Sequence, residues 1–235
     1  MAITYPFRNP LDLKKIYDTL FTTFGPQKWW PGDSPEEIII GAILTQNTSW
    51  KNVEKAILNL KEHDLIDFKK LSQISESTLS PLLIPAGYYN LKTKRLKNFI
   101  TWINTQYNND LAGLRAQSTE QIRSQLLSVN GIGNETADSI ILYALNKPIF
   151  VIDAYTKRIL LQHGFINENA TYKDMQELFH TCFNYELDIF NEFHALIVHI
   201  GKHYCKKSPQ CYLCPLHHDL NVYNSTHNTN NPDNL

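Results

Sequence analysis

Apolar residues recur at spacings of three and four along most of the chain, which is the period of one face of an α-helix. The first predicted helix begins at Pro10 and stops at Gly25-Pro26. The apolar run at 149–152 has the composition of a strand, but it is too isolated to form a sheet. The pattern therefore predicts an all-α fold. The other predicted helices cover about 35–44, 50–60, 67–74, 76–83, 90–107, 119–128, 134–145, 154–163, 172–182 and 186–202.

Two of these helices are expected to be buried because they are apolar on most sides. One follows the cap residue Ser34 and the first-turn residue Pro35, and it is almost wholly apolar from residue 38 to residue 44. The other is nearly continuous in apolar residues over 193–200. Residues 221–235, in contrast, are rich in Asn with Pro and Ser and cannot bury a core, so we predict a disordered tail there.

Length and composition indicate a globular protein. A chain of 235 residues can form one large domain or two small ones with a buried core. Hydrophobic residues at 43% and charged residues at 19% exclude collagen-like and acidic disordered proteins. The net charge of −1 excludes a protein that grips polyanions by its overall charge, although a neutral sum can hide a basic face.

The N-terminal residues lack the basic start and apolar run of a signal peptide, and no stretch reaches the ~18 apolar residues that span a bilayer. We therefore expect a cytoplasmic protein with reduced cysteines. Cys182 stands alone and is expected to be buried, whereas Cys205, Cys211 and Cys214 lie within ten residues. A cluster of this kind favours ligation of a metal or cofactor over disulfide bonds.

A tight turn at 131–133 joins two predicted helices. Gly131 and Gly133 flank Ile132, so the chain can reverse where a Cβ would clash. The start of the second helix offers N–H groups and a positive dipole end, which suit a phosphate. An ordinary turn between helices would show the same pattern, but buried anchors such as Leu126 and Val129 would lock both helices around it.

Five motifs together resemble the helix-hairpin-helix DNA glycosylases of the endonuclease III superfamily. They occur in the order expected for that family between residues 35 and 214. Trp29-Trp30-Pro31 and Glu135 further resemble its endonuclease III-related, 3-methyladenine glycosylase branch. The five motifs are the hairpin 131–137, the aspartate segment 151–155, the glutamine loop 45–48, the segment Gly-Tyr-Tyr-Asn-Leu-Lys at 87–92 and the cysteine loop 205–214.

The resemblance implies two helical lobes with a central DNA-binding cleft. A six-helix lobe that contains the hairpin would cover residues 27–147. Residues 1–26 and 148–220 would form the second lobe, which contains the cysteine loop. The implied partner is double-stranded DNA containing a damaged base, bound by a monomer without any membrane association.

Two acidic residues are the candidate catalytic residues. Members of the family that also cut the DNA backbone attack the sugar with a lysine amine in the second hairpin helix, and Glu135 holds that position here. A carboxylate cannot form a Schiff base, so the resemblance implies hydrolysis without lyase activity unless Lys92 or Lys94 substitutes. Asp153 matches the family's invariant aspartate, which stabilises positive charge on the sugar and orients water. Glu135 would also suit a solvated first turn, and Asp153 a helix cap.

Several residues are candidates for opening the duplex and holding the base. Gln46 matches the residue that fills the space left by a flipped base, although a polar residue at a helix break would look the same. Trp29, Trp30 and Trp50 could stack on the base and would favour a cationic alkylated purine. Lys92 and Lys94, which could contact phosphate, lie in an acid-free stretch at 87–109. The DNA-binding candidates are Gln46, Asn47, Gly131, Ile132, Gly133, Lys92 and Lys94.

The cysteine loop departs from the family pattern C-x6-C-x2-C-x5-C, which holds a 4Fe–4S cluster. Leu220 takes the fourth position, and leucine cannot ligate iron. A 4Fe–4S cluster would then need a fourth ligand such as His217, His218 or solvent, while a small zinc site or a relic loop of reduced cysteines would also fit. The three candidate ligands are Cys205, Cys211 and Cys214.

The sequence therefore predicts a monofunctional base-excision-repair DNA glycosylase that hydrolyses the N-glycosidic bond of a flipped, alkylated purine. One alternative is a bifunctional glycosylase and AP lyase for oxidised pyrimidines, which the absent lysine opposes. The other is a protein that binds DNA structure without catalysis, which Asp153 and Gln46 oppose.

Overall fold

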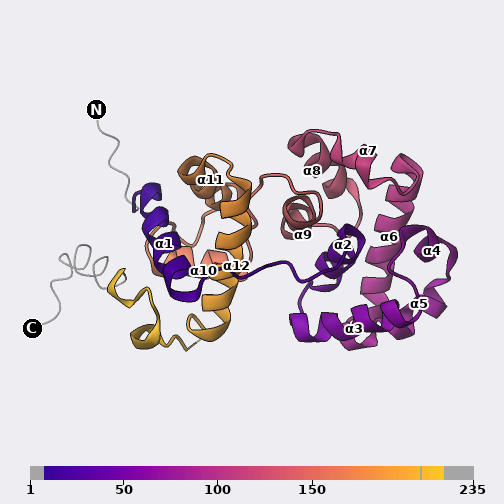
Figure 1. The fold of residues 1–235 in the computed structure, drawn as a ribbon, viewed down its shortest axis with the longest axis horizontal. Coiled ribbons are helices and arrows are strands. Elements are labelled where there is room, and N and C mark those ends of the chain that lie inside the picture. Colours follow the sequence, from indigo (N-terminus) through magenta and orange to yellow (C-terminus); the bar gives the residue numbers. More distant parts are fainter. Residues whose placement is uncertain (1–7, 207, 220–235) are drawn as a thin grey trace, which may run out of the picture. The chain divides into compact units, whose positions relative to one another are not determined.

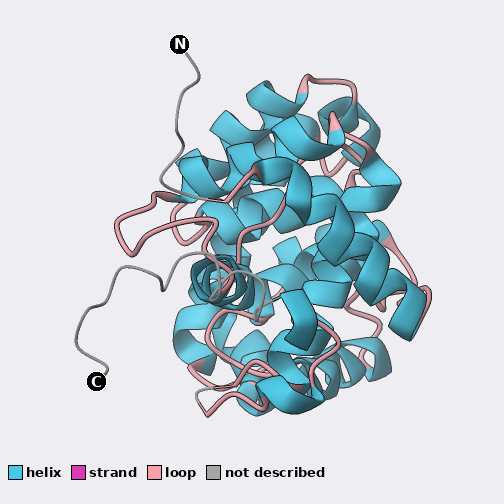
Figure 2. Cartoon of the chain, turned by 90° about the vertical axis from the view of Figure 1, so that its left-hand side faces the viewer, coloured by secondary structure: helices cyan, strands magenta, loops and turns pink. Residues whose placement is uncertain are grey.

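The computed structural model describes residues 8–206 and 208–219, and every regular element among them is helical (Figure 2). The predicted all-α fold is confirmed. Residues 149–152, which have the composition of a strand, lie in an irregular connection between helices. The predicted disordered tail at 221–235 lies outside the described residues. No helix within the described ranges is long and apolar enough to cross a membrane.

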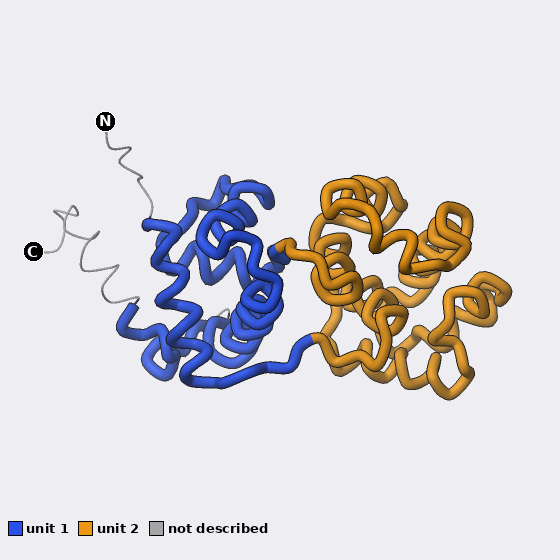
Figure 3. The backbone as a smooth tube through the Cα atoms, turned by 45° about the horizontal axis from the view of Figure 1, so that its top comes forward, with its two compact units in different colours: residues 1–29, 150–235 blue, residues 30–149 orange. Residues whose placement is uncertain are grey.

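The chain forms two compact units (Figure 3). The central unit comprises residues 30–149, and the terminal unit comprises residues 1–29 and 150–235. The helical elements of the central unit are α2 (Pro35–Leu44), α3 (Trp50–Glu62), α4 (Phe68–Gln73), α5 (Glu76–Leu82), η2 (Ile84–Ala86), α6 (Tyr89–Tyr107), α7 (Leu111–Arg115), α8 (Thr119–Ser128), α9 (Asn134–Ser139) and η3 (Ile140–Ala144).

The core of the central unit is built around α2, which packs against α3, α6, α9 and η3 (Figure 1). The helix begins where expected because Ser34 accepts a hydrogen bond from the N–H of Glu37 and Pro35 occupies the first turn. Ile39, Ile40 and the residues of its last turn are buried, as their continuous apolar sequence predicts. This helix therefore fixes the loop that follows it, which contains Gln46.

Two details of the central unit differ from the predicted elements. The single helix expected over 134–145 is α9 followed by η3, a π-helical segment at Ile140–Ala144. The short helix α7 is absent from the prediction, because its five residues carry too little periodicity. Its beginning is set by Asp110, whose carboxylate accepts hydrogen bonds from the N–H groups of Ala112 and Gly113.

The terminal unit surrounds α12, whose predicted burial over 193–200 is confirmed for all but His199. Helices α1 and α10 both pack against it (Figure 1). Gly201 makes the contact with α10 possible, because an added Cβ would lie 2.4 Å from the ring of Tyr155. The elements of this unit are η1 (Pro10–Asp12), α1 (Leu13–Phe24), α10 (Ala154–Gln162), α11 (Tyr172–Phe183), α12 (Leu187–His203) and η4 (Cys211–Leu213).

Candidate functional site

The hairpin turn between α8 and α9 needs the glycine at 131 and its apolar residue, whereas Gly133 has open space around it. Gly131 has φ +97°, which is strained for any side chain, and an added Cβ would lie 2.4 Å from Cγ of Arg95. Ile132 is buried and donates its N–H to the carbonyl of Val129. Gly133 is exposed, with nothing within 4 Å of an added Cβ. A phosphate at this turn would therefore meet the glycine backbones rather than Ile132.

A buried ion pair braces the two hairpin helices. Arg123 on α8 donates through Nε to Oδ1 of Asp138 at 2.7 Å and through Nη2 to Oδ2 at 3.3 Å. Asp138 on α9 is fully buried, and Nη2 of Arg123 also bonds Oδ1 of Asn134 at 2.9 Å. Because a buried carboxylate is costly without a cation, this pair fixes α9 against α8.

Gln46, the predicted wedge residue, is tied to the hairpin. Its Nε2 donates to the carbonyl of Gly131 and to Oγ1 of Thr136, both at 2.9 Å, and Arg95 donates to its Oε1. Both amide hydrogens of Gln46 are therefore in use, so insertion into DNA requires these bonds to open. Asn47 follows as an exposed residue at φ +55°.

Lys92 was predicted to bind DNA, and the structure shows that this assignment is wrong. Only 1% of the residue is exposed, and Nζ donates to the carbonyls of Leu44 at 2.8 Å and Ala86 at 2.7 Å. The ammonium thus provides a hydrogen-bond donor for the last carbonyl of α2 and cannot reach a phosphate. Lys97 is similarly bound to the carbonyls of Leu71 and Ile74. Lys94 between them is exposed, as a DNA contact requires.

The burial of Lys92 predicts a distinct dependence of stability on pH. Burial, helped by the charge of Arg95, lowers the pKa of Lys92 from 10.5 to about 8. Between these values the unfolded chain holds a proton that the folded chain has lost, so the free energy of unfolding rises with pH. In urea unfolding from pH 8 to 10.5, the wild type should gain stability relative to Lys92→Met, whereas Lys94→Met should follow the wild type. Parallel pH trends for the wild type and Lys92→Met would contradict this.

The three candidate stacking tryptophans do not lie in one unit. Trp30 packs edge-on against Trp50 with ring centroids 5.3 Å apart, and Tyr143 lies at the same distance from Trp30. Gly41 of α2 permits this cluster, because an added Cβ would lie 3.3–3.4 Å from both indole rings. Trp29 belongs to the terminal unit, where the ammonium of Lys202 lies 5.4 Å from its ring centroid.

Asp153 caps α10 through one carboxylate oxygen, and the other oxygen takes no part in the cap. Oδ1 accepts hydrogen bonds from the N–H of Thr156 at 2.7 Å and from its hydroxyl at 2.8 Å. Oδ2 faces Nε2 of the buried His194 at 3.8 Å, and only 12% of the Asp153 side chain is exposed. The cap thus holds the carboxylate in one orientation.

Two residues of α12 shape the charge around Asp153, and sequence reasoning missed their part in it. Burial lowers the pKa of His194 more than the charge of Asp153 raises it, which favours a neutral imidazole. Loss of hydration likewise lowers the pKa of Lys202 against the opposing effect of Asp153. Nothing in the sequence links Lys202 to an aspartate 49 positions earlier.

Glu135 lies in the first turn of α9 and is exposed. The carboxylate lies at the N-terminal end of the helix, where the N–H groups and the positive end of the helix dipole favour an acidic side chain. No amine is available from this side chain, whatever binds near it.

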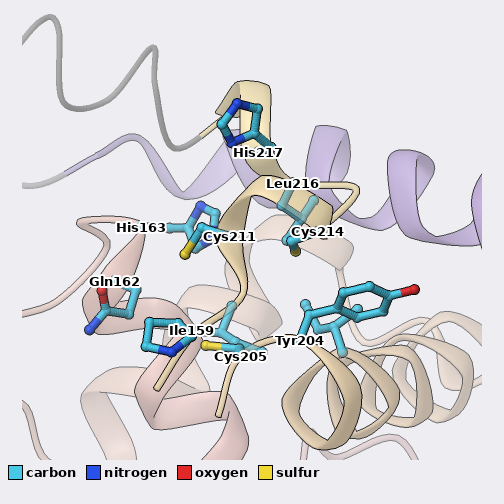
Figure 4. Close-up of a pocket in the computed structure, with 11 residues that line it drawn as sticks. Ile159, Gln162, His163, Tyr204, Cys205, Cys211, Cys214, Leu216 and His217 are labelled. Atoms are coloured by element: carbon cyan, nitrogen blue, oxygen red, sulfur yellow. The ribbon is translucent and has the colours of Figure 1, made fainter. Parts of the chain in front are cut away.

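Three cysteines and two histidines line one cavity of the terminal unit (Figure 4). Burial raises the pKa of the Cys214 thiol, and the neighbouring thiols of Cys205 and Cys211 add to this effect. Among the described residues, no group of three or more His, Cys, Asp or Glu side chains is already arranged to hold a metal ion. Thiols with an imidazole nevertheless form a donor set that suits iron or zinc. Cys182 is buried on α11, as expected.

Comparisons with known proteins agree with the fold and the motifs. Residues 40–184 match the family model of the HhH-GPD superfamily base excision DNA repair proteins. A protein of Methanocaldococcus jannaschii, named as an inferred DNA repair glycosylase, is 48% identical over 203 residues, which cover 86% of this chain and 92% of that protein. Endonuclease III of Sulfolobus acidocaldarius is 32% identical over 178 residues, covering 75% of this chain and 77% of the relative.

A solved structure with the same fold is that of the H. pylori 3-methyladenine DNA glycosylase bound to 1,N6-ethenoadenine, with a TM-score of 0.72 and 29% identity. The similarity covers 83% of this chain and 98% of that one. Since the family model spans more than half of the chain and close relatives cover most of it, the chain belongs to the HhH-GPD superfamily of base excision DNA repair proteins.

Proposed function

We propose that the protein is a monofunctional DNA glycosylase, which hydrolyses the N-glycosidic bond of a damaged base and leaves the DNA backbone intact. The observation that carries the proposal is that the chain holds a fixed carboxylate at Asp153 and has a carboxylate at Glu135, the position at which a lyase needs an amine. We further propose that it acts as a cytoplasmic monomer on double-stranded DNA.

Asp153 has the surroundings that hydrolysis requires. As the base departs, positive charge develops on the sugar, and a held carboxylate stabilises that charge more than it stabilises the ground state. Because Thr156 already fixes Oδ1, little reorganisation is needed during the reaction. Oδ2 can accept the proton of the water that attacks the anomeric carbon, while the bonding electrons leave with the base.

Glu135 removes the route to strand cleavage. A lyase forms a Schiff base between an amine and the anomeric carbon, and elimination follows from that adduct. A carboxylate forms no imine, so the product of this protein is free base and an intact abasic strand. Lys92, one of the two lysines considered as substitutes, is buried on backbone carbonyls.

An alkylated purine is the proposed substrate. Trp30 and Trp50 form an electron-rich cluster in the central unit, which suits a cationic base by stacking and cation–π attraction. The similar H. pylori enzyme is a 3-methyladenine glycosylase and was solved with an alkylated adenine, 1,N6-ethenoadenine. An alkylated purine is also a good leaving group, so it needs little protonation by the enzyme.

A panel of duplexes tests this substrate class. Matched duplexes would carry a methylated purine, 1,N6-ethenoadenine or an oxidised pyrimidine; free base would be measured directly, and strand breaks would be measured before and after alkali. We expect release from the purine substrates at least about tenfold faster than from the pyrimidine, a difference of about 1.4 kcal/mol in barrier. Faster release from the oxidised pyrimidine, with strand cleavage before alkali, would favour a bifunctional enzyme. Binding without release from any duplex would favour a non-catalytic protein.

Gln46 should matter only when the lesion is paired. Unpairing and unstacking a base costs a few kcal/mol, and a side chain that fills the gap recovers part of it. Gln46→Ala should therefore excise a lesion from a fully paired duplex about tenfold more slowly in single-turnover assays. Against a lesion opposite an abasic site, the loss should be much smaller.

The matched control for Gln46 is Thr136→Val, which removes one hydrogen-bond acceptor of Gln46 and keeps Gln46 itself. This variant should excise the paired lesion at least as fast as the wild type. Equal losses of Gln46→Ala on both substrates would contradict the wedge role.

Lys94 and Lys92 form a natural pair for testing phosphate contact. Each phosphate that a lysine neutralises releases counterions, which steepens the dependence of DNA affinity on salt. Lys94→Met should reduce the slope of log affinity against log salt by about one, and Lys92→Met should leave it unchanged. A reduced slope for Lys92→Met would contradict the buried position of this ammonium.

We also propose that the cysteine loop holds the 4Fe–4S cluster of the family. Cys205, Cys211 and Cys214 would supply three thiolates from the lining of one cavity. When bound, the cluster would cross-link Cys205, which follows α12, to Cys211 and Cys214, and no step of base excision passes through it.

A further inference from the structure

The three cysteines leave one iron of a 4Fe–4S cluster without a ligand. The family position for this ligand is Leu220, directly after Asp219, and leucine has no atom that binds iron. Asp219 is the last residue of the described chain and its side chain is mostly buried, with 18% exposed. Its surroundings therefore show which donor the structure brings toward the end of the loop.

Asp219 is bound to His163, a residue far away in the sequence. Nδ1 of His163 lies 2.6 Å from Oδ2 of Asp219, and only 6% of His163 is exposed. His163 lies at the C-terminal end of α10, where its backbone N–H donates to the carbonyl of Ile159. The imidazole of His163 lines the cavity that contains Cys205, Cys211 and Cys214 (Figure 4).

The carboxylate that binds His163 is itself held in place. Arg8 donates to both oxygens of Asp219, through Nη1 at 2.6 Å and through Nη2. The guanidinium also bonds Asp12 at 3.3 Å and lies 4.9 Å from the ring centroid of Phe165. Arg8 thus fixes Asp219, and Asp219 fixes the orientation of His163.

This arrangement is typical of a histidine that ligates a metal. A ligating imidazole uses one nitrogen for the metal and donates the other ring N–H to a carboxylate, which fixes the tautomer and raises the basicity of the ligand. In the tautomer that directs Nδ1–H at Asp219, Nε2 carries the lone pair that a metal would bind. Imidazole is an established iron ligand in place of cysteine in Rieske centres.

We propose that His163 is the fourth ligand of the iron–sulfur cluster, through Nε2, and that it replaces the cysteine that Leu220 has displaced. The inference rests on the cluster proposed above. It assigns Asp219 and Arg8 as the residues that hold the ligand in position.

His217 is the competing histidine and supplies a matched control. It also lines the cavity, and its exchange leaves the 2.6 Å bond between His163 and Asp219 in place. His218 is exposed and is not part of the cavity lining. The two cavity histidines can therefore be exchanged one at a time.

The test uses the full-length protein, purified without oxygen, together with His163→Asn, His163→Cys and His217→Asn. Asparagine keeps an amide N–H where Nδ1 stands, so the bond to Asp219 survives while the distal nitrogen is lost. Cysteine restores four thiolates. Iron and sulfide content are measured, and pulsed EPR of samples reduced by irradiation at low temperature detects nitrogen bound to the cluster.

We expect about four irons per wild-type chain and a coupled nitrogen. His163→Asn should lose that nitrogen and hold about three irons or fewer, whereas His163→Cys should keep four irons without the nitrogen. His217→Asn should match the wild type. Four irons with no nitrogen coupling in the wild type, or loss of the coupling in His217→Asn, would overturn the ligand assignment alone.

Excision by the same preparations separates the two levels of the proposal. A wild-type protein that releases base but contains no iron would overturn the cluster and this ligand, and the glycosylase assignment would stand. A protein with the cluster and the nitrogen coupling but without excision would leave this ligand standing and overturn the proposed activity.

Discussion

Asp153→Asn should slow base excision by roughly 100–10,000-fold and leave DNA affinity within about twofold of the wild type. Asparagine has nearly the shape of aspartate and caps helices equally well, so the hydrogen bonds from Thr156 to the side-chain oxygen can persist. What is lost is the negative charge that stabilises the sugar as the base leaves and accepts the proton of water. Single-turnover release of free base and titration of labelled duplex measure the two quantities.

Asp153→Ala is the control that separates the two roles of this residue. It removes the charge and the cap together, so it should lose excision and also about 1 kcal/mol of stability. A non-catalytic DNA-binding protein would show no effect of Asp153→Asn on any reaction. Excision by Asp153→Asn at the wild-type rate would contradict the proposed mechanism.

Arg123→Ala should destabilise the protein by about 3–5 kcal/mol, because it leaves the fully buried carboxylate of Asp138 without its cation. For a chain of this size the melting temperature should fall by roughly 6–20 °C. Thermal unfolding of the wild type and the variant at one pH measures the effect.

Arg123→Lys gives the intermediate case. Lysine keeps the positive charge but cannot contact both oxygens of Asp138 and Asn134 in the fixed geometry of a guanidinium. Its stability should therefore lie between those of the wild type and Arg123→Ala. A loss below about 1 kcal/mol for Arg123→Ala would mean that this ion pair does not brace the hairpin.

Most of the fold could be predicted because its signals are local. Ser34 and Pro35 begin α2, and the apolar residues that follow show that it is buried. The hairpin is equally local, since Gly131 adopts a backbone conformation that only glycine accepts without strain. Helix α7 and the π-helical segment η3 were missed because neither changes the periodicity over enough residues to be seen.

The candidate site was predicted less completely, because charge in a sequence does not reveal burial. Lys92 and Lys94 look alike in the basic stretch. Lys92 is buried and donates to the carbonyl of Leu44 at the end of α2, whereas Lys94 is exposed. Which lysine is buried depends on where α6 crosses the end of α2, and this is decided by tertiary packing. The same local pattern therefore implies exposure of both lysines, which holds for Lys94 and fails for Lys92.

The partners of the predicted site residues could not be found in the sequence at all. Gln46 was singled out, but its bonds to Thr136 and Arg95 join segments 90 and 49 residues apart. His163 and Asp219 are separated by 56 residues. No spacing rule links such residues, so their contacts emerge only when the helices are packed.

The chemistry at Glu135 and Asp153 is tested most directly by treating the protein with borohydride during excision. A duplex carrying a methylated purine would be incubated with the protein in two parallel samples. The sample with borohydride reports covalent adducts, and the sample without it reports free base and strand breaks, because borohydride reduces the abasic aldehyde and makes the site resistant to alkali. The hydrolytic mechanism predicts stoichiometric release of base, strands that break only after alkali, and no adduct. A protein–DNA adduct trapped by borohydride, with strand cleavage before alkali, would show that an amine of this chain attacks the sugar and would contradict the mechanism.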